Sequence, residues 1–131
     1  MQTLIPPIGW CGPLNRAADM HQAGLDYIEA QLVPMNLEND AAFEEAKARV
    51  RELPLPALAM SYLFPHDFRL VGPEKQEMRN RAYFDRVVAM LAQAKSRIVV
   101  LGSGWTRNVP QGWTPAQAED EFLQALSWCA D

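Results

Sequence analysis

The sequence has few cysteines and histidines, and it lacks a long apolar run. Cys11 and Cys129 are the only cysteines among 131 residues, and with two histidines they form neither a C-x-x-C pair nor a mixed cluster. The pattern gives no sign of a metal site and is typical of two buried free thiols in a reducing compartment. No stretch approaches the ~20 apolar residues that span a bilayer, and no signal peptide is evident. We expect a soluble, cytoplasmic protein without a membrane partner.

An excess of positive charge is also absent. The chain has 12 Lys and Arg residues against 16 Asp and Glu residues, which gives a net charge of -4. A surface that attracts polyanions is therefore not expected, and neither is a nucleic-acid partner. Hydrophobic residues make up 49% of the chain, enough for one packed core. No linker divides residues 1–131, which we interpret as a single domain.

Hydrophobic periodicity predicts strands that alternate with helices. Strands are expected at residues 4–10, 27–32, 57–64 and 98–101, and helices at residues 14–23, 40–53, 74–94 and from 114 onward. Pro6 and Pro7 place the first strand at a sheet edge or give it an irregular start. Residues 57–64 are apolar on both faces, as expected of a buried parallel strand.

Local signals mark the ends of several helices. Gly24 stands where a left-handed cap belongs after the first helix, and Asn39 or Asn36 can cap the second. Thr114 and Gln117 have the spacing of a capping box at the start of the last helix. The buried stripe of the long third helix is expected to consist of Phe84, Val87, Val88 and Leu91.

Strand–helix units in series indicate an α/β protein with a parallel sheet and right-handed crossovers. Four such units fit either an open doubly wound sheet, with helices on both faces, or half of a (β/α)8 barrel, with all helices on one face. Both architectures gather functional side chains in the loops at the carboxyl ends of the strands. Those loops are expected at residues 11–15, 33–39, 65–73 and 102–113.

Three parts of the chain resemble one known family. Residues 24–29 (GLDYIE) are similar to an AGFDYIE segment of that family, and residues 63–65 with 71–73 are similar to its third strand and loop. Residues 100–113 (VLGSGWTRNVPQGW) resemble its VFGSGxARxVPxGF segment, which is the most specific of the three. The family is that of the sugar phosphate isomerases and epimerases, the xylose-isomerase-like TIM barrels. The resemblance covers essentially the whole chain, with the order of segments preserved.

The resemblance implies a (β/α)4 arrangement, the N-terminal half of a TIM barrel of ~250 residues. The chemistry of the family is metal-assisted abstraction of a proton next to a carbonyl group in carbohydrate metabolism. Its divalent metal is bound by two Glu, one Asp and one His, mainly on later strands outside these residues. The resemblance therefore assigns no metal ligand to this chain and leaves its cofactor unknown. Trp105 and Thr106 replace smaller residues of the family pattern, and Leu101 replaces an aromatic one.

The turn after the fourth expected strand holds the first candidate substrate-binding residues. Ser103, between Gly102 and Gly104, belongs to a tight turn that either faces an anion or a sugar hydroxyl or simply ends the strand. The guanidinium of Arg107 suits a phosphate or carboxylate, or else forms a surface ion pair. An apolar wall for a sugar ring, or ordinary packing, is expected of Trp10 and Trp105 together with Tyr62, Phe64 and Trp113.

Two residues are the candidates for catalysis. Glu29 lies at the centre of an otherwise apolar strand, where a buried carboxylate needs a partner. It faces either the barrel mouth, where it can bond to substrate, or an arginine of a neighbouring strand or loop. His66 and Asp67 follow the third strand, and they either act as an acid/base pair or contribute to a metal site. Two adjacent residues alone are not a metal motif.

These observations support three functions. The first is a sugar or sugar phosphate isomerase/epimerase-like protein whose active site is incomplete in this chain alone. The second is a non-catalytic half-barrel that self-associates, because four strands leave two open edges and an apolar inner face that a homodimer would close. The third is a small α/β module that binds an anion or a sugar at the Gly102 turn.

Overall fold

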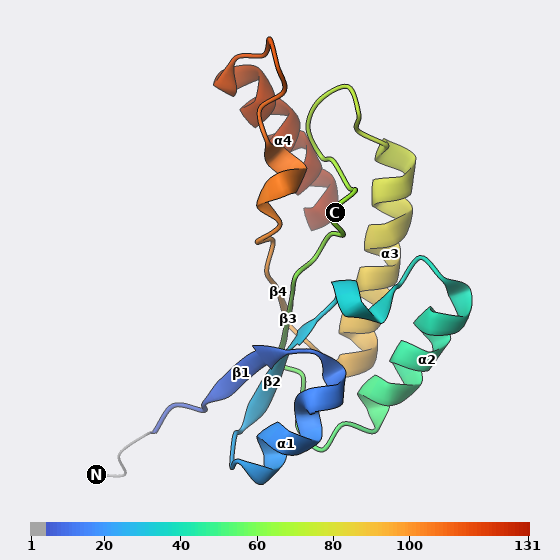
Figure 1. Ribbon diagram of the computed structural model, residues 1–131, viewed down its shortest axis with the longest axis vertical. Coiled ribbons are helices and arrows are strands. Elements are labelled where there is room, and N and C mark those ends of the chain that lie inside the picture. Colours follow the sequence, from blue (N-terminus) through green and yellow to red (C-terminus); the bar gives the residue numbers. More distant parts are fainter. Residues whose placement is uncertain (1–4) are drawn as a thin grey trace.

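The computed structural model describes residues 5–131 and shows an α/β fold built on one sheet (Figure 1). Within this range, four parallel strands lie side by side in chain order: β1 (Gly9–Gly12), β2 (Tyr27–Gln31), β3 (Ala59–Ser61) and β4 (Ile98–Val99). The same residues form the α-helices α1 (Ala17–Gln22), α2 (Asp40–Arg51), α3 (Glu77–Ala94) and α4 (Pro115–Ala130). Short 3-10 helices follow β1, β2 and β4: η1 (Leu14–Arg16), η2 (Val33–Met35) and η3 (Gly104–Arg107). The predicted series of strand–helix units is confirmed.

The strands are shorter than the sequence predicted. β1 begins at Gly9, after two prolines that have no amide hydrogen for the ladder, and the predicted start at residue 4 lies outside the described residues. β3 ends at Ser61 because Tyr62 adopts a left-handed conformation with a φ of 56°. β4 ends at Val99 rather than at residue 101. The third helix is also shorter than predicted, because α3 begins at Glu77 rather than at residue 74.

The predicted helix caps are confirmed. Gly24 has a φ of 82°, and the amides of Gly24 and Leu25 bond back to carbonyls in the last turn of α1, which makes a Schellman motif. The side chain of Asn39 caps α2 by accepting a hydrogen bond of 2.9 Å from an amide of the first turn. Thr114 and Gln117 form a complete capping box at α4. These caps fix where each helix leaves its loop.

The two faces of the sheet differ in what covers them. On β2, Ile28 is fully buried beneath the helices, whereas Glu29 and Gln31 are half-buried on the opposite face. Figure 1 shows α1, α2 and α3 on one side of the strands. α4 joins that side, since the rings of Trp128 in α4 and Phe84 in α3 meet edge-on with centroids 5.6 Å apart. The parallel sheet with helices on one face is compatible with half of a β/α barrel and differs from the doubly wound alternative.

We call the uncovered side the open face and the other side the helix face. The strand pairing places Cys11, Glu29, Gln31, Ala59, Ser61 and Ile98 on the open face. It places Trp10, Gly12, Ile28, Ala30, Met60 and Val99 on the helix face. The helix face holds much of the core, with Ile28, Ala30 and Met60 all 0% exposed.

Two predictions of burial are wrong. Val88 is 48% exposed although Val87 is fully buried, because adjacent helical residues point about 100° apart and cannot both face the core. Cys11 is exposed because it lies on the open face of an edge strand, whereas Cys129 is partly buried, and both thiols are free. No helix of residues 5–131 has both the length and the apolar composition needed to cross a membrane.

Candidate functional site at the carboxyl ends of the strands

The loops that follow β3 and β4 are fastened together by buried hydrogen bonds. Ser103 is 1% exposed, and its hydroxyl accepts a hydrogen bond of 3.1 Å from the Phe64 amide. The indole N–H of Trp105 donates to the Pro65 carbonyl at 2.9 Å. Paired polar groups in a buried setting hold their surroundings rigidly. The two loops therefore form one platform at the carboxyl end of the sheet.

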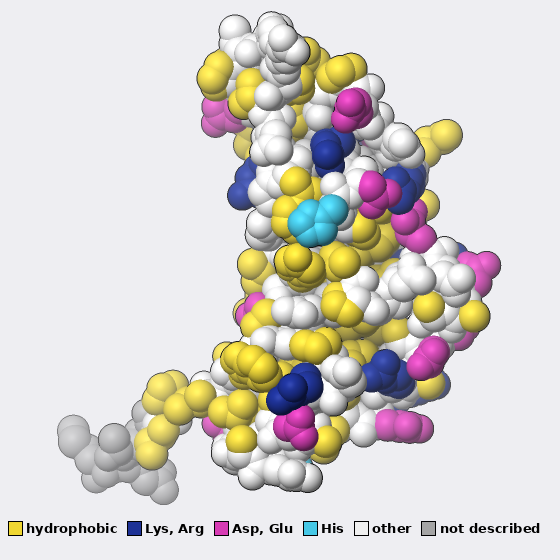
Figure 2. Space-filling model, viewed as in Figure 1, with side chains coloured by type: hydrophobic (Ala, Val, Ile, Leu, Met, Phe, Trp, Pro, Cys, Tyr) yellow, Lys and Arg dark blue, Asp and Glu magenta, His cyan; other side chains and the backbone are white. Residues whose placement is uncertain are grey.

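An aromatic cluster stands on this platform. The His66 ring stacks on Trp105 with centroids 3.9 Å apart, and the Tyr62 ring meets Trp105 edge-on at 5.7 Å. The Tyr62 hydroxyl and Nε2 of His66 are 3.3 Å apart, within hydrogen-bond range. Tyr62 and His66 are both exposed, and Figure 2 shows a histidine at the surface among apolar side chains. An exposed imidazole that is held in place by stacking on an aromatic ring can exchange a proton with a ligand at the surface.

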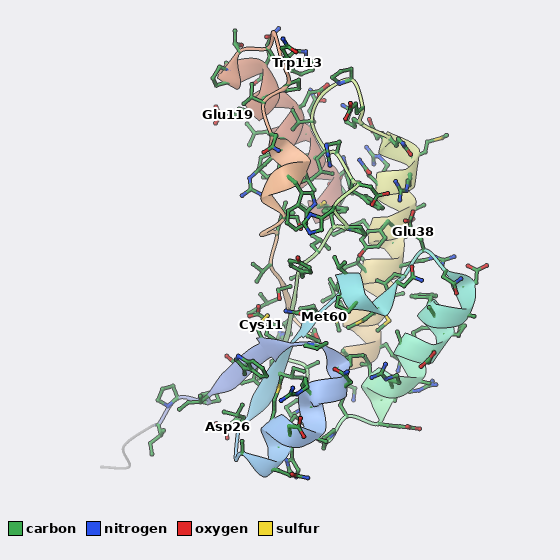
Figure 3. The ribbon with its side chains drawn as sticks, viewed as in Figure 1. Cys11, Asp26, Glu38, Met60, Trp113 and Glu119 are labelled. Atoms are coloured by element: carbon green, nitrogen blue, oxygen red, sulfur yellow. The ribbon has the colours of Figure 1, made fainter. Side chains whose placement is uncertain are left out.

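An ionic network centred on Arg79 holds the loop after β3. Arg79 of α3 forms a bidentate pair with Glu38, both contacts being 2.7 Å, and its Nη2 also lies 2.7 Å from Asp67. Figure 3 shows Glu38 beside α3. The hydrogen bond from Arg79 holds the pKa of Asp67 below its ordinary value despite some desolvation. The network thus joins the segment before α2, the loop after β3 and the start of α3.

A second anchor ties α4 to the same loop. The carboxylate of Glu121 accepts a hydrogen bond of 2.7 Å from the Gly72 amide and lies 3.1 Å from the ammonium group of Lys75. Desolvation raises the pKa of Glu121, but the hydrogen bond from Gly72 and the charge of Lys75 outweigh it and leave the pKa below its ordinary value. The loop that carries His66 is therefore fixed at both of its ends.

Polar side chains also gather on the open face, near the carboxyl ends of the strands. Sγ of Cys11 lies 3.2 Å from Oγ of Ser61, and the amide of Gln31 approaches the same sulfur at 3.8 Å. Glu29 stands beside Cys11 in the β1–β2 ladder. Figure 3 shows Cys11 in the middle part of the molecule, between Asp26 at one end and Trp113 at the other. This face offers a carboxylate, a thiol and an amide to a ligand, while the buried hydroxyl of Ser61 pairs with the thiol.

The structure gives the predicted substrate-binding residues different surroundings. Both hydrogen bonds of the Ser103 hydroxyl go to the backbone of Phe64, so this side chain links the loop after β4 to the loop after β3. The guanidinium of Arg107 is exposed and rests 5.5 Å from the centroid of the Phe122 ring. Within residues 5–131 it forms no ion pair, so the surface-pair interpretation of Arg107 is wrong. A role of either residue in ligand contact stays a prediction.

The expected wall of five aromatic residues does not form within one chain. Trp105 and Tyr62 are together, but Phe64 is fully buried in the core against Phe68. Trp10 is 52% exposed on the helix face of β1, at the opposite edge of the sheet from β4. Two strands separate these edges, which is why aromatic residues near both ends of the chain cannot meet.

The catalytic candidates are also kept apart from their expected partners. Among residues 5–131, Glu29 has no arginine partner, so its side chain is half-buried on the open face without an ion pair. His66 and Asp67 do not form an acid/base pair, because His66 turns to Tyr62 and Asp67 turns to Arg79. Each keeps its own chemistry, and Glu29 and His66 stay the candidates.

The side chains do not fit a metal centre of the kind that the family resemblance implies. Across residues 5–131, no three His, Cys, Asp or Glu side chains come together as a possible ligand set. Glu29 belongs to a strand and His66 to a loop. The nearby acidic groups Asp67 and Glu38 pair with Arg79, and Glu121 pairs with Lys75. No step that requires a metal follows from these residues.

Sequence reasoning missed the polar group on the open face and the role of Arg79. A signal for the first exists, since Gln31 comes two positions after Glu29 and alternate residues of a strand share a face. No local signal identifies Arg79 as the partner of Glu38, because the two residues are far apart in the chain.

Comparison of the chain with protein-family models, with characterised proteins and with solved structures finds no match.

Proposed function

We propose that this chain is the sugar-binding half of a (β/α) barrel of the sugar phosphate isomerase/epimerase type. The observation that carries the proposal is the cluster of the exposed Tyr62 and His66 with the partly buried Trp105, on a rigid platform at the carboxyl ends of β3 and β4. In β/α barrels this end of the sheet carries the active site. The exposed Tyr62 ring suits the apolar face of a sugar, and its hydroxyl and the His66 imidazole suit the hydroxyl groups.

The residues also suit the chemistry of that class. Isomerisation next to a carbonyl needs a group that removes a proton from carbon and a group that can return one to carbon or oxygen. In this proposal the Glu29 carboxylate accepts the carbon-bound proton, and the His66 imidazole handles the proton of the sugar oxygen. Glu29 pairs with the first residue of β3, whereas His66 follows the end of that strand, so in this proposal the sugar extends along β3 between the two groups. One chain holds too few such groups to complete the site.

Titration of the labelled protein with a ketose phosphate such as fructose 6-phosphate, followed by NMR, tests the proposal. We expect the indole signal of Trp105 to shift at millimolar ligand, and Trp105→Phe to weaken binding about fivefold by loss of aromatic contact area. Trp113→Phe, the same change in the same connecting segment, is the control and should leave the affinity unchanged. Where the other half of the barrel completes the site, exchange of the carbon-bound hydrogen in D2O should occur and should be lost in Glu29→Gln.

Two further ligands separate the alternatives. If inorganic phosphate alone shifts the residues of the Gly102 turn and the sugar adds nothing, the chain is an anion-binding module. If unphosphorylated fructose binds as well as its phosphate, the aromatic cluster is the recognition element and no phosphate site is needed. If none of the three ligands changes the spectrum, the proposal of a sugar site fails.

A further inference from the structure

The two edge strands of the sheet are short, and their segments are apolar and uncharged. Residues 98–101 (IVVL) contain no charge or proline, and Ile98 and Val100 are 59% and 42% exposed. Residues 9–12 (GWCG) at the other edge also carry no charge or proline. Edges of this kind are usually paired or covered. We propose that a second copy of this chain covers both edges, with β1 of each copy pairing in parallel with β4 of the other to close an eight-stranded barrel.

The register of this pairing follows from the sheet itself. One row of paired residues crosses it: Cys11, Glu29, Ala59 and Ile98. In an eight-stranded β/α barrel, a row of paired residues that is followed once around the sheet returns to its first strand about eight residues away. Each four-stranded half therefore contributes a shift of about four residues to the pairing. One sense of stagger would place Asn15 beside Ile98, but Asn15 belongs to the helical turn η1. The other sense pairs extended segments and places Trp10 of the partner subunit beside Leu101.

The side chains at this predicted contact are complementary. Trp10 is 52% exposed on the helix face, at the β1 edge. Leu101 lies beside the β4 edge and lines an apolar groove of about 190 Å³ with Val99, Leu126 and Cys129. Burial raises the pKa of the Cys129 thiol to about 11, as expected in an apolar setting. A tryptophan anchored in an apolar groove is the usual form of an interface hot spot.

The surface area of the chain agrees with an interface of this size. A monomer of 14.7 kDa is expected to expose about 6,900 Å². This chain exposes 8247 Å², an excess of about 1,300 Å² over that expectation. A standard interface buries about 800 Å² on each partner. Residues 5–8, which are exposed here, extend from β1 and would lie along β4 of the partner. This inference is independent of the proposed sugar site, because its tests measure only mass and cross-linking.

The first test is the mass in solution, by light scattering or sedimentation. We expect twice the chain mass of 14.7 kDa at micromolar concentration. Trp10→Arg should raise the dissociation constant at least 100-fold, because it places a charge in the apolar groove. Met78→Arg, the same type of change at a side chain that is 87% exposed on α3, is the control and should leave the dimer intact. A monomer, or an assembly larger than two copies, would overturn the proposal.

The second test fixes the register and does not depend on the stability of Trp10→Arg. In a background of Cys11→Ser and Cys129→Ala, the pair Trp10→Cys with Leu101→Cys should form a covalent dimer on oxidation. A bridge within one chain is not possible, because three strand spacings put the edges about 14 Å apart, whereas a disulfide needs Cα atoms within about 7 Å.

The matched control for the register is Trp10→Cys with Arg97→Cys. Arg97 lies four residues before Leu101 on the same segment, about 13 Å away along a strand. We expect at least tenfold less covalent dimer from this pair. Equal cross-linking of both pairs, or more from the Arg97 pair, would overturn the proposed register even if the protein were a dimer.

Discussion

The helix face and the open face of the sheet are formed by alternate residues of the same strands, but they differ in what completes them. On the helix face, Ile28 and Met60 are 0% exposed and are covered by helices of the same chain. On the open face, Cys11 is exposed and Glu29 has no ion-pair partner among residues 5–131. The difference shows that packing against helices on the helix face stabilises the fold. The side chains of the open face are left to contact a ligand or a partner.

The largest effect that distinguishes the faces is expected from neighbouring residues of β2. Ile28→Ala removes a fully buried side chain and should lower the free energy of unfolding by about 2–5 kcal/mol. Glu29→Ala, one position along the strand, should cost less than about 1 kcal/mol. Urea denaturation at one fixed chain concentration measures both. Equal losses would mean that the open face is as well covered as the helix face.

The next effect concerns the fastening of the platform. Ser103→Ala leaves the buried amide of Phe64 without its acceptor and should cost about 1–3 kcal/mol. Ser127→Ala, at an exposed position of α4, is the control and should change stability by less than about 0.5 kcal/mol. Thermal and urea unfolding give the values. If Ser103→Ala keeps full stability but loses affinity for sugar phosphate, the hydroxyl serves the ligand rather than the loops.

The smallest effect is one of pH. The pKa of Glu121 is lowered in the folded chain, so its contribution to stability is present above the ordinary pKa of about 4.5 and is lost as the pH falls through the folded value. We expect Glu121→Gln to cost about 1 kcal/mol at pH 7 and the difference from the unchanged chain to shrink by pH 3. Unfolding curves at both pH values test this. A difference that stays constant with pH would show that the charge of Glu121 is not what holds Gly72.

The sequence predicted the parts of the fold that depend on neighbours in the chain. Gly24 and Asn39 act as expected because a cap is decided within one turn of helix. The candidate site was only partly predictable, because its contacts join distant segments. His66 and Asp67 are adjacent in sequence, but Arg79 draws Asp67 away from the histidine.

Burial on the open face was unpredictable for a related reason. Periodicity shows which residues share a face but not which face the helices cover. For that reason Cys11 was expected inside and lies outside. The same limit applies to Trp10, whose aromatic character suggested a ligand contact and whose position at a sheet edge suggests a protein contact instead.

The order of the strands has a kinetic consequence. Because β1, β2, β3 and β4 lie across the sheet in the order in which they occur in the chain, each strand–helix unit docks on the unit that precedes it. During synthesis on the ribosome the N-terminal residues of a chain emerge first. A chain of this topology can add one unit at a time as it emerges, and at each stage the newest strand is the one left as the growing edge.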